Sequence, residues 1–129
     1  MKKVTLPLRV RFCETDAGGV VYHGRYFEYF EAGRNEFLTR MGLSYKQLVA
    51  LGYHLPVIEA QVRYLSPAFF DDKLDIEVSV ELQGSRVIAH HKITREGKLL
   101  TEAKTVHAFI NKAGKPVRPL REFTELITK

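Results

Sequence analysis

Residues 11–24 read Arg-Phe-Cys-Glu-Thr-Asp-Ala-Gly-Gly-Val-Val-Tyr-His-Gly, between an alternating apolar run and an aromatic-rich run. Aspartate is a poor residue for closing a strand, and the two glycines after Asp16 remove side-chain bulk where the chain must turn. The stretch therefore predicts a single acid, Asp16, at a tight turn facing the start of a helix. Because a helix start carries unpaired N–H groups and partial positive charge, it can stabilise an oxyanion while the acid acts as base or nucleophile.

The flanking segments have the periods of a strand and of a helix. Alternating apolar residues predict a strand over 4–13. A helix is predicted over 23–41 with Gly42 as its C-terminal stop, because one apolar stripe runs along it through Tyr26, Phe30, Gly33, Phe37 and Met41. Ser44 is expected to cap a second, short helix that runs to about Leu51.

The remainder of the chain changes to a period of two. Strands are predicted over 58–64, 74–82, 87–94 and 99–111, with a hairpin turn at Glu96-Gly97-Lys98 and either a short helix or a frayed tail over 120–128. The chain is thus expected to form one α+β domain over 1–129, a long helix against about five antiparallel strands. One helix cannot cover both faces of such a sheet, so self-association is expected to cover the other face or an edge.

Composition limits the class of protein and the partners. The chain has 129 residues, 45% hydrophobic residues and a net charge of +5, which favours anionic partners. No apolar run approaches the roughly 18–20 residues that span a bilayer, so no membrane insertion is expected. The N-terminus lacks the apolar segment of a signal peptide, and Cys13 is the only cysteine, which together predict a reducing, cytoplasmic location.

The predicted long helix contains charged residues that do not fit its apolar stripe. On a helical wheel Arg34 falls inside the apolar arc, and Glu31 lies next to it, three residues away. One interpretation is a half-buried ion pair that fixes the helix or a subunit contact. The other is that Glu31 is a second acid of the site, or its true base. Gly33 between them indicates close approach of the helix backbone to the sheet or to a ligand.

Other chemistries find less support. Catalysis by Cys13 would need a thiolate beside an imidazole, whereas a free cysteine is more often a small buried hydrophobe. His90 and His91 point to opposite faces of a strand and cannot easily share an ion, so no metal site is expected. Nucleic-acid binding would need a basic, aromatic sheet face, but the predicted strands carry mixed charge.

Several motifs resemble one enzyme family. Residues 15–23, Thr-Asp-Ala-Gly-Gly-Val-Val-Tyr-His, with Tyr26 and the pattern Glu31-x-x-Arg34, resemble the hotdog-fold acyl-CoA thioesterases. The branch most similar to them is the 4-hydroxybenzoyl-CoA thioesterase-like group, including its Tol-Pal-associated acyl-CoA thioesterases. The later patterns Tyr64-x-Ser66-Pro67-Ala68 and Asp71-Asp72-x-Leu74 fit the second and third strands of such proteins, so the resemblance covers nearly the whole chain.

The resemblance implies a fold, an assembly and a reaction. The fold is a long central helix wrapped by a curved antiparallel sheet, dimerised so that the sheets run on across the interface and often doubled into a homotetramer. The reaction is hydrolysis of an acyl-CoA thioester to a free acid and CoA, with CoA as part of the substrate and no cofactor. An alternative is a hotdog protein that binds acyl-CoA or acyl carrier protein without hydrolysis.

Roles for individual residues follow from the same resemblance. Asp16 takes the place of the family's nucleophile or general base, and the backbone amide of His23 that of the carbonyl-polarising donor. The His23 imidazole either positions water or the thioester, or caps the helix and contacts a neighbour. Tyr22 is included among the catalytic candidates, although it and Tyr26 are expected to line the acyl pocket or the core.

Substrate contacts are assigned to the rest of the motif and to basic residues near the sheet rim and the C-terminus. Gly19, Val20 and Tyr26 are expected to bind the substrate. By position, Arg86, Arg118 and Arg121 are expected to hold the CoA phosphates, unless they are solvated surface arginines. The tyrosine that some family members carry just before the motif is absent here.

Overall fold

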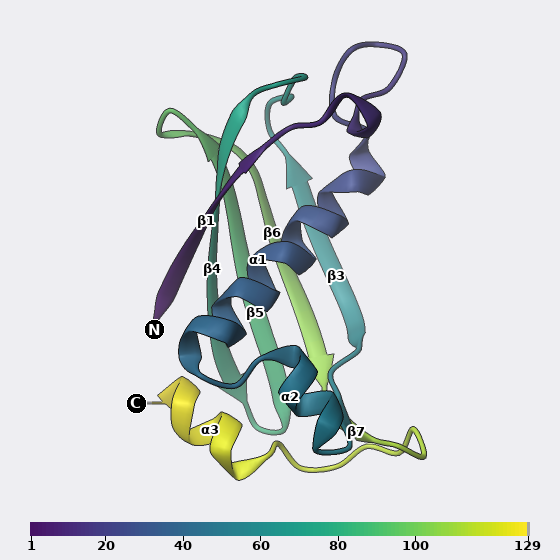
Figure 1. Cartoon of the computed structure of the whole chain (residues 1–129), viewed down its shortest axis with the longest axis vertical. Coiled ribbons are helices and arrows are strands. Elements are labelled where there is room, and N and C mark those ends of the chain that lie inside the picture. Colours follow the sequence, from purple (N-terminus) through teal and green to yellow (C-terminus); the bar gives the residue numbers. More distant parts are fainter. Residues whose placement is uncertain (129) are drawn as a thin grey trace.

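The long helix lies diagonally across one face of an antiparallel sheet (Figure 1). The computed structural model describes residues 1–128. A 3₁₀ turn, η2 (His23–Arg25), runs without a break into α1 (Tyr26–Met41), which confirms the helix predicted over 23–41. Gly42 ends α1 in the left-handed region at φ 97°, a conformation that costs glycine little.

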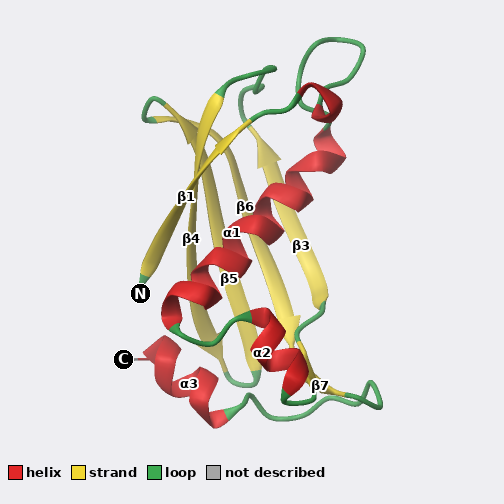
Figure 2. Ribbon diagram, viewed as in Figure 1, coloured by secondary structure: helices red, strands yellow, loops and turns green. Residues whose placement is uncertain are grey.

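Five strands form the main sheet (Figure 2). They pair antiparallel in the order β1-β4-β5-β6-β3, with the bounds β1 (Lys3–Arg9), β4 (Lys73–Gln83), β5 (Arg86–Arg95), β6 (Lys98–Ala108) and β3 (Val57–Tyr64). Since β3 lies at one edge and β4 lies beside β1, the segment 65–72 must cross the end of the sheet. That crossover brings Ala68 and Phe69 against the segment that precedes α1.

The core lies between α1 and the inner face of the sheet. Phe30 and Phe37 of α1 and Ile76 and Val78 of β4 have no exposed surface. A Cβ atom on Gly33 would stand 2.7 Å from Val78 Cγ2 and 2.9 Å from Ile76 Cγ2, both well inside van der Waals contact. Of the two reasons expected for Gly33, close packing on the sheet is therefore the one found.

The outer face of the sheet is polar. Glu77, Lys92, Glu102 and Arg63 pair side by side across β4, β5, β6 and β3, so their charges alternate. Arg63 and Glu102 form an ion pair of 2.9 Å. Because such a row is stable in water, this face needs no cover. Exposed apolar side chains gather instead along the β3 edge, at Val57, Ile58 and Tyr64.

Two predicted strands are shorter than expected. β1 ends at Arg9 rather than at residue 13, and Phe12–Glu14 forms a 3₁₀ turn, η1, because the Glu14 carboxylate accepts the Arg11 amide. The last strand does not continue to residue 111. It ends at Ala108, and β7 (Ile110–Asn111) then pairs with β2 (Tyr53–His54) in a separate small sheet.

The two short helices pack at the end of the molecule opposite the η1 turn. Ser44 caps α2 (Tyr45–Ala50) as predicted, accepting the Gln47 amide at 3.2 Å while Gln47 reaches back to the Ser44 amide. The C-terminal segment is a helix, α3 (Arg121–Thr128), rather than a frayed tail. Its Phe123 is buried against Phe109, which ties the helix to the body of the fold.

Candidate active site

Asp16 lies in a closed turn, as its sequence context predicted. The Asp16 amide donates to the Val20 carbonyl at 2.8 Å, and the Gly19 amide donates back to the Asp16 carbonyl at 3.0 Å. Gly19 has φ 82°, a value that favours glycine. The Asp16 carboxylate is exposed and accepts the Gly18 amide at 2.8 Å, which leaves its other oxygen open to solvent.

The arms of this turn form a short antiparallel clip. Thr15 bridges Val21, and the Tyr22 amide donates to the Glu14 carbonyl at 2.9 Å. The crossover segment holds the clip from outside, because the Val21 amide donates to the Ala68 carbonyl at 2.9 Å. The clip therefore fixes Asp16 relative to the residue after Tyr22, which is the first residue of the helix.

His23 is the first residue of that helix, so its amide precedes the intrahelical hydrogen bonds. In η2 the first amide with an intrahelical acceptor is that of Arg25, which donates to the Tyr22 carbonyl at 2.9 Å. The amides of His23 and Gly24 precede it and so have no acceptor within the helix. The His23 imidazole does not cap the helix. It is exposed and stacks on Tyr22 with ring centroids 4.4 Å apart.

Tyr64, at the end of β3, holds the same turn from the sheet. Its hydroxyl donates to the His23 carbonyl at 2.9 Å, and its ring lies edge-on to Tyr26 at 5.1 Å. Tyr26 itself is 3% exposed and belongs to the core, one of the two positions expected for it. The resemblance marked Tyr64 as part of a motif, but only the structure shows its contact with the helix start.

Glu14 is a buried acid to which the sequence pattern assigned no role. Its carboxylate accepts the Arg11 amide at 2.8 Å and the Tyr29 hydroxyl at 2.9 Å, and the Arg11 guanidinium lies at 3.1 Å. Burial alone would raise the pKa of the Glu14 carboxyl, but these hydrogen bonds outweigh burial and lower it. The spacing of Arg11 and Glu14 was visible in the sequence, whereas the contact with Tyr29 on α1 was not.

Glu31 and Arg34 do not form the expected ion pair. None of the ion pairs within 4.0 Å among the described residues includes Arg34, and its guanidinium contacts His91 Nε2 at 3.3 Å. Burial, with the charge of Arg34, lowers the pKa of His91 to about 3, so the ring is neutral and accepts this hydrogen bond. Glu31 is exposed, and at about 1.5 Å per residue it lies about 12 Å along the helix from His23.

The three arginines expected to hold phosphates lie far from Asp16 in the same chain. The segment that contains Asp16 is at the top of the molecule in Figure 1, whereas the β4–β5 hairpin and α3 are at the bottom. Arg86 starts β5 at that hairpin, 4.0 Å from Glu59. Arg121 starts α3 and pairs with Glu125 at 3.1 Å, and Arg118 is exposed just before it. One chain therefore does not bring them to the turn.

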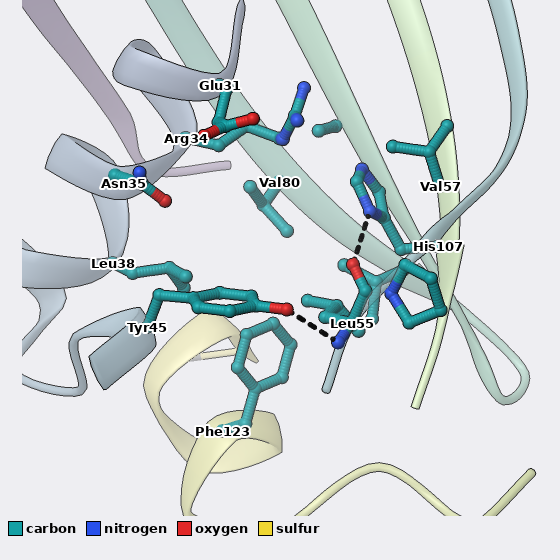
Figure 3. Close-up of a pocket in the computed structure, with 13 residues that line it drawn as sticks. Glu31, Arg34, Asn35, Leu38, Tyr45, Leu55, Val57, Val80, His107 and Phe123 are labelled. Atoms are coloured by element: carbon teal, nitrogen blue, oxygen red, sulfur yellow. Dashed lines mark hydrogen bonds between the residues drawn. The ribbon is translucent and has the colours of Figure 1, made fainter. Parts of the chain in front are cut away.

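The described residues contain no group of three or more metal-binding side chains and no helix long and apolar enough to span a membrane. Neither Asp16 nor His23 lines the cavities of about 290 Å³ (Figure 3) and 210 Å³ that the described part of the chain encloses.

Comparison with known proteins places the chain in a family. The family model of the thioesterase-like superfamily matches residues 10–126. The chain belongs to the thioesterase-like superfamily. Its hotdog fold and its class, thioester hydrolase, follow from that membership.

Relatives of this thioesterase match over most of their own length. A putative esterase of Aquifex aeolicus is 33% identical over 92% of this chain and 93% of its own. The acyl-CoA thioester hydrolase YbgC of Escherichia coli is 35% identical over 78% of this chain and 76% of its own. The crystal structure of a probable thioesterase from Bartonella henselae is 35% identical, covers 92% of this chain and 100% of its own, and superposes with a TM-score of 0.87.

Proposed function

We propose that this thioesterase hydrolyses acyl-CoA, with Asp16 as nucleophile or general base and the His23 amide as the donor to the thioester carbonyl. The observation that supports the proposal most is the turn itself. It presents an exposed carboxylate on a rigid clip beside a helix start whose first amides have no intrahelical acceptor. The thioesterases named for acyl-CoA among the relatives supply the substrate class.

The chemistry needs only these two groups and water. The carbonyl oxygen of the thioester accepts the His23 amide, which favours the negative charge that develops on it during attack. As a general base, Asp16 takes a proton from water while the water oxygen bonds to the carbonyl carbon. The C–S bond then breaks, and the CoA thiolate leaves and is protonated, so the products are a carboxylic acid and CoA thiol. As a nucleophile, Asp16 attacks the carbonyl carbon and expels the CoA thiolate, and water then hydrolyses the resulting mixed anhydride to the free acid and the Asp16 carboxylate.

We extend the proposal to the assembly, a homodimer or a dimer of dimers. β3 is an edge strand, and exposed Val57, Ile58 and Tyr64 line it. Pairing of two β3 edges would continue the sheet and bury these side chains. A second subunit could then supply the phosphate-binding arginines, since those of the same chain lie at the far end from Asp16. Because Cys13 is exposed and has no cysteine partner in the chain, we also propose a reducing, cytoplasmic location.

The test is release of CoA thiol from a panel of short-chain, long-chain and aryl acyl-CoAs, with acyl carrier protein thioesters as a second donor class. Asp16→Asn should lower kcat on every good substrate by about 10²–10⁴-fold, the range for loss of a general base. Unchanged turnover by this variant would remove Asp16 from the mechanism.

Two companion variants separate the remaining roles. His23→Ala keeps the backbone amide, so a large loss of kcat in that variant would assign a role to the imidazole as well. Glu31→Gln should leave turnover intact if Asp16 is the base. If Glu31→Gln alone abolishes turnover in a folded protein, Glu31 takes that role. Tight CoA binding without turnover across the panel would favour the non-hydrolytic alternative.

A further inference from the structure

The crossover between β3 and β4 connects the sheet to the clip that carries Asp16. Ala68 of the crossover is fully buried and accepts the Val21 amide at 2.9 Å, and Phe69 forms an antiparallel bridge with Val20. Val20 in turn accepts the Asp16 amide at 2.8 Å. Because the hydrogen bonds inside the turn fix its shape but not its place on the sheet, the position of Asp16 depends on where the crossover lies.

Backbone hydrogen bonds hold the crossover at its two ends. At one end the Leu65 amide donates to the Leu100 carbonyl at 2.8 Å, and at the other the Asp71 amide donates to the Val10 carbonyl at 3.0 Å. Between these ends the described chain forms no strand. Asp71 has φ 67°, in the left-handed region that costs a residue other than glycine free energy. Contacts with the rest of the fold must therefore hold this part of the chain.

Arg95, the last residue of β5, supplies such contacts from the sheet. Its Nη1 donates to the Asp72 carboxylate at 2.6 Å and to the Pro67 carbonyl at 3.3 Å, and its Cζ lies 5.8 Å from the centroid of the Phe69 ring. The same Asp72 oxygen accepts the Phe69 amide at 2.8 Å. The β5–β6 hairpin, which begins at Arg95, and the segment that contains Asp16 both lie at the top of the molecule in Figure 1. One side chain of the sheet thus binds the middle of the crossover.

This ion pair differs from a second pair beside it in its exposure to water. The side chains of Arg95 and Asp72 are 26% and 23% exposed. Those of Arg9 and Asp71, which pair at 2.9 Å, are 54% and 57% exposed. Water screens the exposed pair, so the shielded pair is expected to contribute more to holding the chain. The Arg95–Asp72 pair also binds two backbone groups of the crossover, whose place it therefore fixes.

We propose that Arg95 is a positioning residue for hydrolysis, because by holding the crossover it fixes the clip that presents Asp16 beside the His23 amide. The contacts run from Arg95 through Asp72 to the crossover, and from the crossover through Val20 to Asp16. This role rests on the proposed function, since an effect on turnover requires Asp16 to be the acting acid. A displacement of about 1 Å in a catalytic group can cost about 10²-fold in rate.

Amide hydrogen exchange of the whole chain tests the contact without reference to catalysis. Arg95→Gln should speed the exchange of the Asp16 and Val21 amides at least about tenfold more than that of Val78 in the central strand β4. Arg9→Gln, which breaks the exposed pair, should leave all three unchanged. Equal acceleration at the three amides in Arg95→Gln would indicate a general loss of stability and overturn the proposal, as would no acceleration at Asp16 and Val21.

Kinetics with a good acyl-CoA substrate connect the contact to the reaction. Arg95→Gln should lower kcat about tenfold and leave KM nearly unchanged. Asp72→Asn, which keeps an oxygen for the Phe69 amide, should have the same effect, and the double variant should lose no more than either single one because both remove one contact. Arg95→Lys, which keeps the charge, should recover part of kcat. Additive losses, or a change in KM alone, would contradict a positioning role.

A matched control and Asp16→Asn separate this role from the proposed function. Arg63→Gln breaks a 2.9 Å ion pair with Glu102 on the outer face of the sheet and should keep the wild-type kcat. If Asp16→Asn abolishes turnover while Arg95→Gln keeps the wild-type kcat, the role of Arg95 is wrong and the proposed function stands. If Asp16→Asn keeps full turnover, the proposed function fails and with it the effect of Arg95 on hydrolysis, whereas hydrogen exchange still decides whether Arg95 holds the turn.

Discussion

The hydroxyl of Tyr29 on α1 donates a 2.9 Å hydrogen bond to the buried carboxylate of Glu14, two residues before Asp16. Through Glu14 the helix thus holds the arm of the turn that carries the proposed catalytic acid. The same carboxylate binds the Arg11 amide and guanidinium, and the Glu14 carbonyl accepts the Tyr22 amide. The Glu14 side chain therefore joins Arg11 to α1, and the Glu14 backbone carbonyl joins Tyr22 to the same point.

Glu14→Gln should lower kcat more than it changes KM. The substitution keeps the size of the side chain but removes the charge that its donors stabilise, at a cost of about 1–3 kcal/mol in unfolding free energy. Tyr29→Phe removes one of the hydrogen bonds and should cost about 1 kcal/mol. Urea unfolding and thioester kinetics measure the two effects. Arg9→Gln, which breaks an exposed ion pair with Asp71, is the control. Wild-type kcat in folded Glu14→Gln would show that the carboxylate does not position the turn.

Tyr64→Phe should lower kcat several-fold and leave the fold intact. The hydroxyl alone holds the His23 carbonyl, while the ring keeps its packing on Tyr26, so stability should fall by only about 0.5–1.5 kcal/mol. The measurement is kcat and KM on a good acyl-CoA substrate. Tyr53→Phe, which removes a hydroxyl at the other end of the molecule, should retain activity. Equal kcat values for the two variants would contradict a positioning role for Tyr64.

Gly33→Ala should destabilise the protein by about 1–2 kcal/mol. Alanine favours a helix over glycine by about 1 kcal/mol, but its methyl group would overlap Val78 and Ile76, and overpacking a core costs about 1–3 kcal/mol. Chemical denaturation measures the change. The penalty should shrink in a Val78→Ala background, where space is opened next to the new methyl group. A stabilised Gly33→Ala protein would show that the helix can move away from the sheet at no cost.

The stability of the protein should fall on acidification below about pH 6.5. His91 has a folded-state pKa of about 3 because it is buried and lies beside Arg34, whereas an unfolded histidine titrates near 6.5. Between these two pH values the unfolded chain binds one more proton than the folded protein. The contribution of neutral His91 to the free energy of unfolding is therefore complete above pH 6.5. That contribution is lost at up to about 1.4 kcal/mol per pH unit as the pH falls toward 3.

The unfolding free energy measured from pH 7 to pH 4.5 checks this dependence. His91→Gln should flatten the slope, while His90→Gln on the opposite face of β5 should keep it because His91 is intact. An unchanged slope in His91→Gln would assign the acid sensitivity to His107 and Glu14, whose pKa values are also lowered in the fold.

Local patterns were enough to predict the helix, the inner strands and the turn. Helix bounds follow from an apolar stripe and a left-handed glycine stop, both of which act within a few residues. The Glu96-Gly97 hairpin also forms as predicted, with both residues at positive φ. Strand ends were less predictable, since β1 stops where the Glu14 side chain captures the Arg11 amide instead of continuing the ladder.

The sequence by itself determined the position of Asp16, in a glycine-containing turn before an amphipathic helix, because turn chemistry and helix periodicity are short-range. Only the tertiary structure decided that Glu14 is buried under Tyr29, that Tyr64 holds His23, and that Arg34 contacts His91 rather than Glu31. These partners lie 15, 41 and 57 residues apart along the chain. They meet because β3 pairs with β6 at the sheet edge and α1 packs across the inner face, and long-range packing of this kind leaves no period in the sequence.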